Sequence, residues 1–228
     1  NYILSFGSFG DSIGFFNQPC GIMCDKNNNL FVCDSLNHRV QKFTSNGKYI
    51  MSWGTLGDKA GHFNSPHSIC QDKKGFLYIT ERANHRIQKF TPDGEFVLSF
   101  GKQGNKDGEF LQPIGICYHN GMILVGEKAT DKIQIFDLDG NFIKSFNYSR
   151  ETTLNMQGTS NISVDQNGYI YISEVWNNKL YIFSEEFQLI TSIDSSDNFF
   201  TGTGGTAFSG QYMFLCDNAY HQIHRFSH

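Results

Sequence analysis

Charged side chains five residues apart recur along this chain and are its clearest candidates for chemistry. An acidic residue ends one apolar run, and a mostly basic residue begins the next. The acidic positions are Asp34, Glu81, Glu127, Glu174 and Asp217, and the basic positions are Arg39, Arg86, Lys132 and Lys179, with Gln222 breaking the pattern. Two interpretations are open. The basic side chains could grip an acidic partner or RNA, or each could pair with the acid across its own loop.

Imidazole and aromatic side chains stand beside these charges. His38 precedes Arg39, and His85 precedes Arg86. Trp176 and Tyr220 occupy loop positions where most other copies carry small or polar residues, so we expect them to anchor a partner rather than to build the loop. The alternative is that both rings fold over the loop and cover apolar surface. The candidate partner-binding residues are Arg39, Arg86, Lys132, Lys179, His38, His85, Trp176 and Tyr220.

Metal or acid–base catalysis has weaker support. His67 follows Pro66, and Cys20 holds the same place after Pro19. Two possible ligands fall short of the three protein ligands that a catalytic zinc usually has. No Ser/His/Asp, phosphate-loop or paired-carboxylate pattern stands out. We therefore expect a non-enzymatic chain with no catalytic residue, no metal and no cofactor.

The candidate residues lie in a repeat that spans the whole chain. The segment NHRVQKF at 37–43 returns as NHRIQKF at 84–90, so the period is about 47 residues (90 − 43). Weaker copies end at Phe136, Phe183 and Phe226. Each copy contains β-rich runs separated by turn dipeptides such as Asn46-Gly47 and Asp93-Gly94. Four short strands per period describe one blade of a β-propeller.

The two ends of the sequence complement each other. Residues 1–7 match the fourth run of later repeats, and the chain ends after a third run. We therefore predict an all-β, five-bladed propeller with four-stranded antiparallel blades, closed by the N-terminal strand completing the last blade near Ile3 and Ile223. The whole chain, 1–228, would be one domain. It would consist of an outer strand at 1–7 and repeats at about 14–54, 61–101, 108–147, 155–194 and 203–228.

The segment FNSPHSICQDKKGFLYITERANHRIQKFTPDGEFVLSFG, residues 63–101, and its partner at 16–54 resemble the NHL-repeat family. The resemblance implies a propeller, although family propellers commonly have six blades. It also implies three functional classes. These are a protein- or RNA-recognition module, as in tripartite-motif ubiquitin ligases; an extracellular sensor, as in bacterial receptor kinases; and a zinc enzyme, as in the peptidyl-hydroxyglycine lyase.

Composition limits the kinds of partner and the compartment that we expect for this chain. A formal net charge of −4 gives no general attraction to nucleic acid or to an anionic membrane. No apolar run approaches the roughly 18 residues of a spanning helix. The six cysteines look like small buried residues of a reducing compartment, which predicts a cytoplasmic protein. We expect a monomeric propeller within a larger chain or assembly. It would dock a protein or peptide on the face formed by the loops between second and third strands and the loops between blades, which we call the loop face. RNA on the same face is the alternative, and a zinc-dependent lyase is a remote one.

Overall fold

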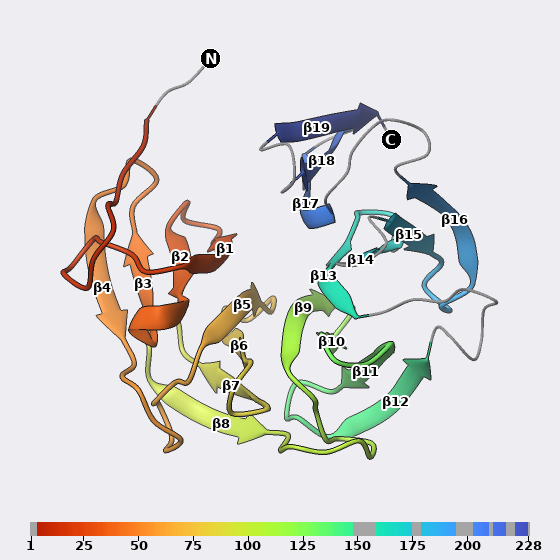
Figure 1. Cartoon of the computed structure of the whole chain (residues 1–228), viewed down its shortest axis with the longest axis horizontal. Helices are drawn as coiled ribbons and strands as arrows, with labels where there is room; N and C mark the ends of the chain where they lie inside the picture. Colours follow the sequence, from red (N-terminus) through yellow and green to blue (C-terminus); the bar gives the residue numbers. More distant parts are fainter. Residues whose placement is uncertain are drawn as a thin grey trace. The chain divides into compact units, whose positions relative to one another are not determined.

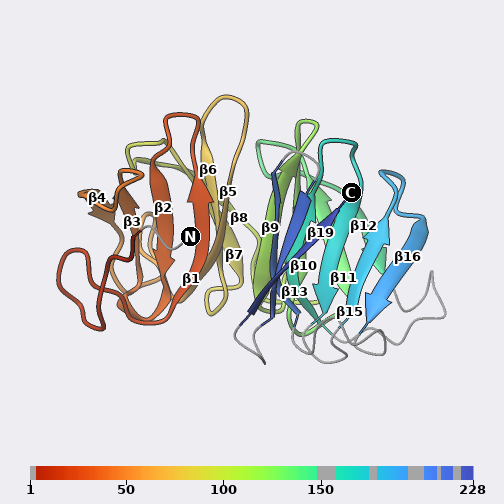
Figure 2. The same cartoon turned by 90° about the horizontal axis from the view of Figure 1, so that it is seen from above.

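The structure is a computed structural model that describes residues 4–147, 158–174, 179–194, 203–209, 212–217 and 222–227. Within these ranges the regular structure consists of strands β1 to β19 and one short 3-10 helix, η1 (Ser35–Asn37). The strands form five antiparallel sheets in chain order (Figure 1; Figure 2). The described part of the chain holds no apolar helix of membrane-spanning length.

The sheets follow the predicted repeats closely. The first contains β1 (Pro19–Cys24), β2 (Leu30–Asp34), β3 (Arg39–Phe43) and β4 (Tyr49–Trp53), and the second contains β5 (Pro66–Gln71), β6 (Leu77–Glu81), β7 (Arg86–Phe90) and β8 (Phe96–Phe100). The third contains β9 (Pro113–His119), β10 (Met122–Glu127), β11 (Lys132–Phe136) and β12 (Phe142–Asn147). The fourth contains β13 (Thr159–Val164), β14 (Ile170–Glu174), β15 (Lys179–Phe183) and β16 (Leu189–Asp194). The fifth contains β17 (Thr203–Ser209), β18 (Tyr212–Asp217) and β19 (Gln222–Ser227).

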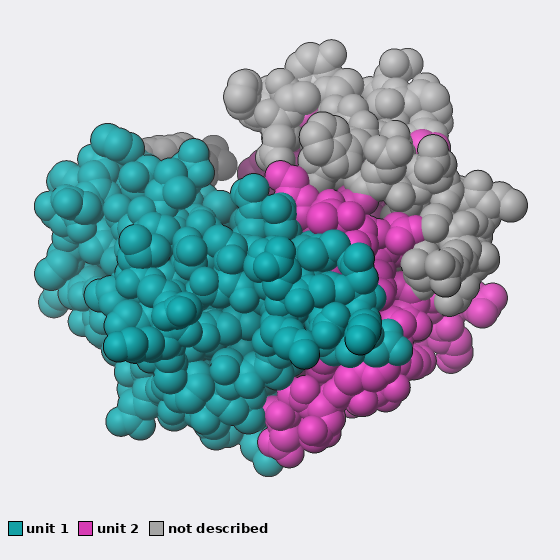
Figure 3. All heavy atoms as spheres, turned by 60° about the horizontal axis from the view of Figure 1, so that its bottom comes forward, with its two compact units in different colours: residues 1–113 teal, residues 114–228 magenta. Residues whose placement is uncertain are grey.

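These sheets confirm the fold class predicted from the repeat, an all-β propeller of five blades. The chain separates into two compact units, residues 1–113 and 114–228 (Figure 3). The first unit holds the first two blades, β1 to β8. The second holds the three blades of β9 to β19, apart from Pro113. The prediction of one domain over 1–228 stays a prediction.

The turns form where the dipeptides predict them. Gly47 and Gly94 have φ values of 78° and 79°, which a residue with a side chain rarely adopts. Asn28 takes the same left-handed region between β1 and β2, with φ 61°. The fourth repeat lacks a glycine at its second hairpin, and there Phe187 carries the positive φ of 65°. That repeat thus departs from the Asn-Gly and Asp-Gly pattern, and its backbone accommodates the turn at Phe187.

The core of the first unit shows why a phenylalanine ends the third strand of each of its blades. Phe43 and Phe90 end β3 and β7 and are buried. The ring of Trp53, in β4 of the first blade, lies 6.2 Å from Phe31 of its own blade and 5.9 Å from Phe90 of the second blade, measured between ring centroids. The Trp53 ring of the outer strand therefore packs the first blade onto the second.

The predicted closure strand does not appear among the described residues. Leu4 to Ser8 belong to no strand, and the fifth sheet has three strands there rather than four. Ile3, on which the prediction relied, lies outside the described residues. Closure by the N-terminal strand therefore stays a prediction.

The cysteines differ in burial, which corrects the expectation that all are buried. Cys33 and Cys117 are buried, Cys70 is half-buried, and Cys20, Cys24 and Cys216 are exposed. All six are free thiols. Burial raises the pKa of Cys33 and Cys117, because the thiolate cannot be solvated in an apolar site. A cytoplasmic address stays a prediction.

Cys24 and Cys33 lie in the same blade and make a direct test of this division. We expect iodoacetamide to alkylate Cys24 in the native protein and Cys33 only after denaturant is added, because the thiolate is the reactive form. Peptide mass spectrometry of samples labelled with and without urea measures both sites. Equal native labelling of the two would contradict the burial of Cys33.

Candidate functional site

A buried carboxylate ends the second strand of the first blade. Asp34 Oδ2 accepts hydrogen bonds from Arg39 Nε at 2.8 Å, Asn37 Nδ2 at 2.9 Å and Gln41 Nε2 at 3.1 Å. Its Oδ1 accepts the backbone N–H of Asn17 at 2.7 Å. The charge of Asp34 is thus satisfied by four donors, three of them side chains of the NHRVQ segment.

The second blade repeats the arrangement with a glutamate, whose side chain is one methylene longer than that of aspartate. Glu81 accepts hydrogen bonds from Arg86 Nε at 2.5 Å, Asn84 Nδ2 at 2.6 Å, Gln88 Nε2 at 2.7 Å and the Asn64 N–H at 3.0 Å. Burial raises the pKa of Glu81, and the hydrogen bond and charge of Arg86 oppose that rise. The ion pair with Arg86 therefore helps to keep a carboxylate ionised inside the blade.

The later blades keep the pairing in a looser form. Lys132 Nζ lies 3.8 Å from Glu127 Oε1, and Lys179 stands opposite Glu174 in the register of β15 and β14. Local pairing, the second interpretation of these charges, therefore describes Arg39, Arg86 and Lys132. A role of the basic residues in holding a partner stays a prediction.

The two arginines also hold the loop that leads into their own blade. We call residues 7–16, 54–63 and 101–110 the lead-in loops. Arg39 donates from Nη2 to the carbonyls of Ser12 and Phe15 at 2.8 and 2.9 Å. Arg86 donates from Nη2 to those of Lys59 and His62 at 3.0 and 3.1 Å. Their guanidinium groups are thus bound within the blade, and the NHR segment acts as a clamp on its lead-in loop.

The two loop histidines join successive blades. His38 and His85 both have φ 55°, in the left-handed region. Nδ1 of His38 accepts the N–H of Ser65 at 3.2 Å, and Nδ1 of His85 accepts the N–H of Gln112 at 3.1 Å. Since an acceptor Nδ1 carries no proton, each bond holds a neutral imidazole. Both histidines were predicted to contact a partner; the structure places them in these joints, and partner contact stays a prediction.

The remaining candidates add no catalytic centre to the described residues. Trp176 and Tyr220 lie outside those residues. Cys20 and His67 lie on β1 and β5, the first strands of neighbouring blades. Across the described ranges no group of three His, Cys, Asp or Glu side chains is arranged to hold a metal ion. A non-enzymatic role without cofactor stays a prediction.

Four apolar side chains on the first blade are exposed and were not among the candidate binding residues predicted from the sequence. Phe9 is 83% exposed, Ile13 63%, Phe15 42% and Leu36 43%. We call them the first-blade patch. Asn37 Nδ2 donates to the Gly10 carbonyl at 2.8 Å, and the Leu36 N–H donates to the Asn17 carbonyl at 3.0 Å. These bonds hold η1, which carries Leu36, against the segment that carries the other three.

The same positions in the next two repeats show that the loop itself does not require apolar residues. Each lead-in loop is closed by the same kind of isolated parallel bridge, Phe9↔Phe16, Leu56↔Phe63 and Gln103↔Phe110. The patch positions hold Leu56, Ala60, His62 and Ala83 in the second repeat and Gln103, Asp107, Glu109 and Ala129 in the third. A register comparison of the lead-in loops would have revealed this loss of apolar character.

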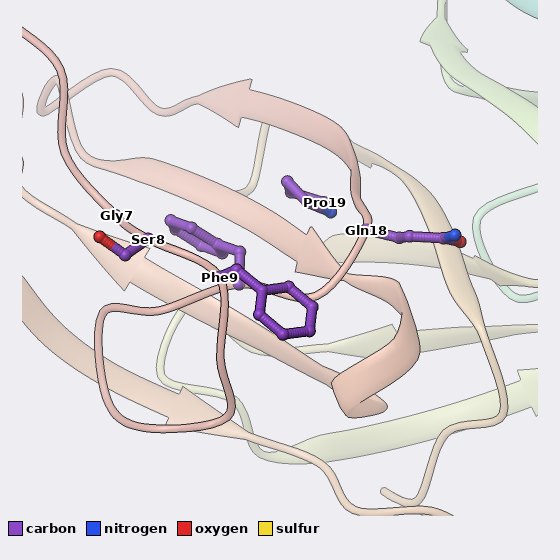
Figure 4. A pocket seen from close by; sticks show the side chains of 6 residues that line it. Gly7, Ser8, Phe9, Gln18 and Pro19 are labelled. Atoms are coloured by element: carbon purple, nitrogen blue, oxygen red, sulfur yellow. The ribbon is translucent and has the colours of Figure 1, made fainter.

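A hollow lies beside the patch, at the start of β1. It has a volume of about 340 Å³ and is lined by Gly7, Ser8, Phe9, Phe16, Gln18 and Pro19 (Figure 4). Most of its wall is apolar, and it is open to solvent.

Comparison with solved structures supports the fold. A catalytically inactive virginiamycin B lyase from Staphylococcus aureus with quinupristin is 20% identical, with a TM-score of 0.70, and the match covers 92% of this chain and 66% of that one. A chain of the nidogen/laminin complex is 12% identical, with a TM-score of 0.72, covering 92% and 75%. A streptogramin B lyase is 15% identical, with a TM-score of 0.64, covering 92% and 68%. At these identities the likeness concerns the fold alone.

The chain spans about two thirds of the length of the first lyase structure. No curated protein matches the sequence. The family model of the NHL repeat matches residues 16–43 and 63–90, which are the segments that carry the two carboxylate clamps. These two matches and the five blades together fit an NHL-repeat β-propeller family.

Proposed function

We propose that this propeller is a non-enzymatic module that docks a protein partner on its loop face, through the first-blade patch. The observation that carries the proposal is the exposure of Phe9, Ile13, Phe15 and Leu36 at positions where the third repeat has a polar, two acidic and a small residue. Apolar side chains gathered on a surface, with no packing role, are typical of protein interfaces.

The charges near the patch favour a protein over RNA. Arg39, the basic residue of the repeated acid–base pair in this blade, is bound to Asp34 and to two loop carbonyls. Asp11, on the same loop, is exposed. An RNA-binding face would instead present free cations toward the phosphates. A similar fold occurs in a chain of the nidogen/laminin complex, an assembly of proteins.

A swap between repeats tests the proposal. The variant Phe9→Gln, Ile13→Asp, Phe15→Glu and Leu36→Ala gives the first blade the residues of the third, whose lead-in loop has the same closing bridge. We expect the melting temperature to stay nearly unchanged and partner capture from RNase-treated lysate to fall by about tenfold or more, the loss expected for interface anchors. Quantitative mass spectrometry of the captured proteins measures it.

The control makes the same kind of change on the second blade. Leu56→Gln, Ala60→Asp and His62→Glu should leave capture unchanged, because these residues are outside the patch. Equal loss in both variants, or no loss in either, would refute docking at the first blade. Capture that disappears with RNase and falls steeply with salt would favour RNA instead.

A further inference from the structure

Three polar side chains from two neighbouring blades of the second unit meet at one point. His119 ends β9 and Asn120 follows it, both in the third blade, and Glu185 lies in the turn between β15 and β16 of the fourth. Glu185 Oε1 lies 3.0 Å from His119 Nε2 and accepts a hydrogen bond from Asn120 Nδ2 at 2.8 Å. Asn120 Nδ2 also lies 3.0 Å from His119 Nε2. The three atoms therefore form a nearly equilateral triangle.

The repeat does not require these residues. The corresponding turn of the third repeat is formed by Asn120 and Gly121, whose φ values of 46° and 81° suit a two-residue hairpin. In the first, second and fourth repeats an aspartate stands in the place of His119 and accepts backbone N–H groups of its own turn; these are Asp25, Asp72 and Asp165. The place of Glu185 holds no acid in the first three repeats, where it is Ser45, Pro92 and Leu138. Two departures from the repeat thus meet across adjoining blades.

No assignment of protons satisfies all three contacts of the triangle. If His119 Nε2 carries a proton, it donates to Glu185 but meets the Asn120 amide group, a second donor, at 3.0 Å. If Nε2 carries none, it accepts from Asn120 but meets the Glu185 carboxylate, a second acceptor. Rotating the amide by half a turn, which exchanges its nitrogen and oxygen, only moves the conflict to another side of the triangle. Hydrogen bonding alone therefore leaves one contact repulsive.

A metal ion bound by all three side chains removes this conflict, because each ligand then presents a lone pair to the same centre. Asn120 would offer Oδ1, which the half turn of its amide places where Nδ2 lies. Two ligand atoms at right angles, each about 2.1 Å from a metal, are about 3.0 Å apart, whereas tetrahedral ligands would be about 3.4 Å apart. The separations of 2.8, 3.0 and 3.0 Å match one face of an octahedron.

The surroundings of the triangle suit a cation. Hydrogen bonds from Asn120 and His119 lower the pKa of Glu185, so its carboxylate is ionised at neutral pH. The side chain of His119 is 13% exposed and that of Glu185 is 49% exposed. Packing thus holds the imidazole in place, while water can reach the coordination positions on the side of the carboxylate.

We propose that His119, Asn120 and Glu185 bind a divalent transition-metal ion in octahedral coordination, with water at the other positions, and so tie the third blade to the fourth. An imidazole ligand favours ions such as Ni²⁺ or Zn²⁺ over Mg²⁺ and Ca²⁺, which prefer oxygen ligands. The turns that carry the site lie at the opposite end of the strands from the loop face. Metal binding is therefore independent of the proposed docking of a protein.

Calorimetric titration of the tag-free, EDTA-washed 228-residue chain with nickel chloride tests the site. We expect one Ni²⁺ to bind per chain and the affinity to fall by about tenfold or more in His119→Gln and in Glu185→Gln, because each loses a direct ligand. His62→Gln and Glu186→Gln are matched controls outside the triangle and should bind as the native chain does. Nickel should raise the melting temperature of the native chain and the controls, and not that of the two ligand variants.

Asn120→Asp separates metal coordination from simple hydrogen bonding. Aspartate tolerates the left-handed backbone of residue 120, but its carboxylate would lie against that of Glu185. We expect a lower melting temperature than the native chain in EDTA and an affinity for Ni²⁺ at least as high, since the metal gains a charged ligand. Native chain that binds no nickel, binding that ignores both ligand variants, a weakened affinity in Asn120→Asp, or equal competition by Mg²⁺ would each overturn the proposal.

Discussion

Replacing Arg86 with alanine should lower the free energy of unfolding by about 3 kcal/mol or more at neutral pH, the usual cost of leaving one member of a buried ion pair alone. Glu81 would lose its shortest hydrogen bond and its ion pair with Arg86, while staying buried. The lead-in loop of the second blade would lose three further hydrogen bonds, from Arg86 to the carbonyls of Asp58, Lys59 and His62. Urea unfolding of the variant and the native chain measures the difference.

The pH dependence of this loss separates charge from packing. Without Arg86, burial raises the pKa of Glu81 further, so the folded variant binds a proton more tightly than the unfolded chain. Its stability then falls as the pH rises through that folded pKa, and the gap to the native chain should narrow in acid. Arg82→Ala, an exposed arginine of the same loop, should cost less than about 0.5 kcal/mol. A gap that stays constant with pH would indicate lost packing instead.

Gly21→Ala should also cost about 3 kcal/mol, at the upper end of the range for overpacking. Gly21 lies in β1, where a Cβ would come within 2.6 Å of the His67 carbonyl oxygen and 2.7 Å of the Ser68 Cα. Both atoms belong to the backbone of β5, so neither can rotate away as a flexible side chain would. The first and second blades would have to separate, and thermal unfolding should report a clear drop in melting temperature.

Gly205→Ala is the matched control, because Gly205 holds the corresponding place in β17 and a Cβ there meets no atom within 4 Å. Its melting temperature should stay near that of the native chain or rise slightly, since alanine restricts the unfolded chain more than glycine does. A Gly21→Ala protein as stable as the Gly205→Ala protein would show that the first two blades are not packed as closely as the structure has them.

Blade number and hairpin turns could be predicted from the sequence because their causes are local. An alternating run and an Asn-Gly or Asp-Gly pair specify a hairpin without reference to the rest of the chain. The period near 47 residues then sets how many blades follow. The cysteines show the limit of this reasoning, because Cys33 and Cys216 share a repeat position and yet only Cys33 is buried. Burial depends on what packs against a strand, which the repeat pattern does not encode.

The candidate site was only partly predictable, for the same reason. The pairing of Asp34 with Arg39 follows from their places on adjoining strand ends. The joint between His38 and Ser65 does not, because it depends on how one blade stacks on the next and on a left-handed backbone at both residues. The first-blade patch was missed for another reason. Three of its four residues lie in a glycine-rich loop, whose glycines predict turns and say nothing about which side chains are exposed.

The sequence separation of the contacts within and between the first two blades affects how the first unit folds. The Asp34 clamp closes within the first blade, and the bonds from His38 to Ser65 and from Lys42 to Pro92, which join the first blade to the second, connect residues 27 and 50 positions apart. Contacts that close over short chain lengths form quickly and need little of the chain to be present. During synthesis the first blade can therefore complete its clamp, and then serve as a template for the second, before the C-terminal half of the protein has left the ribosome.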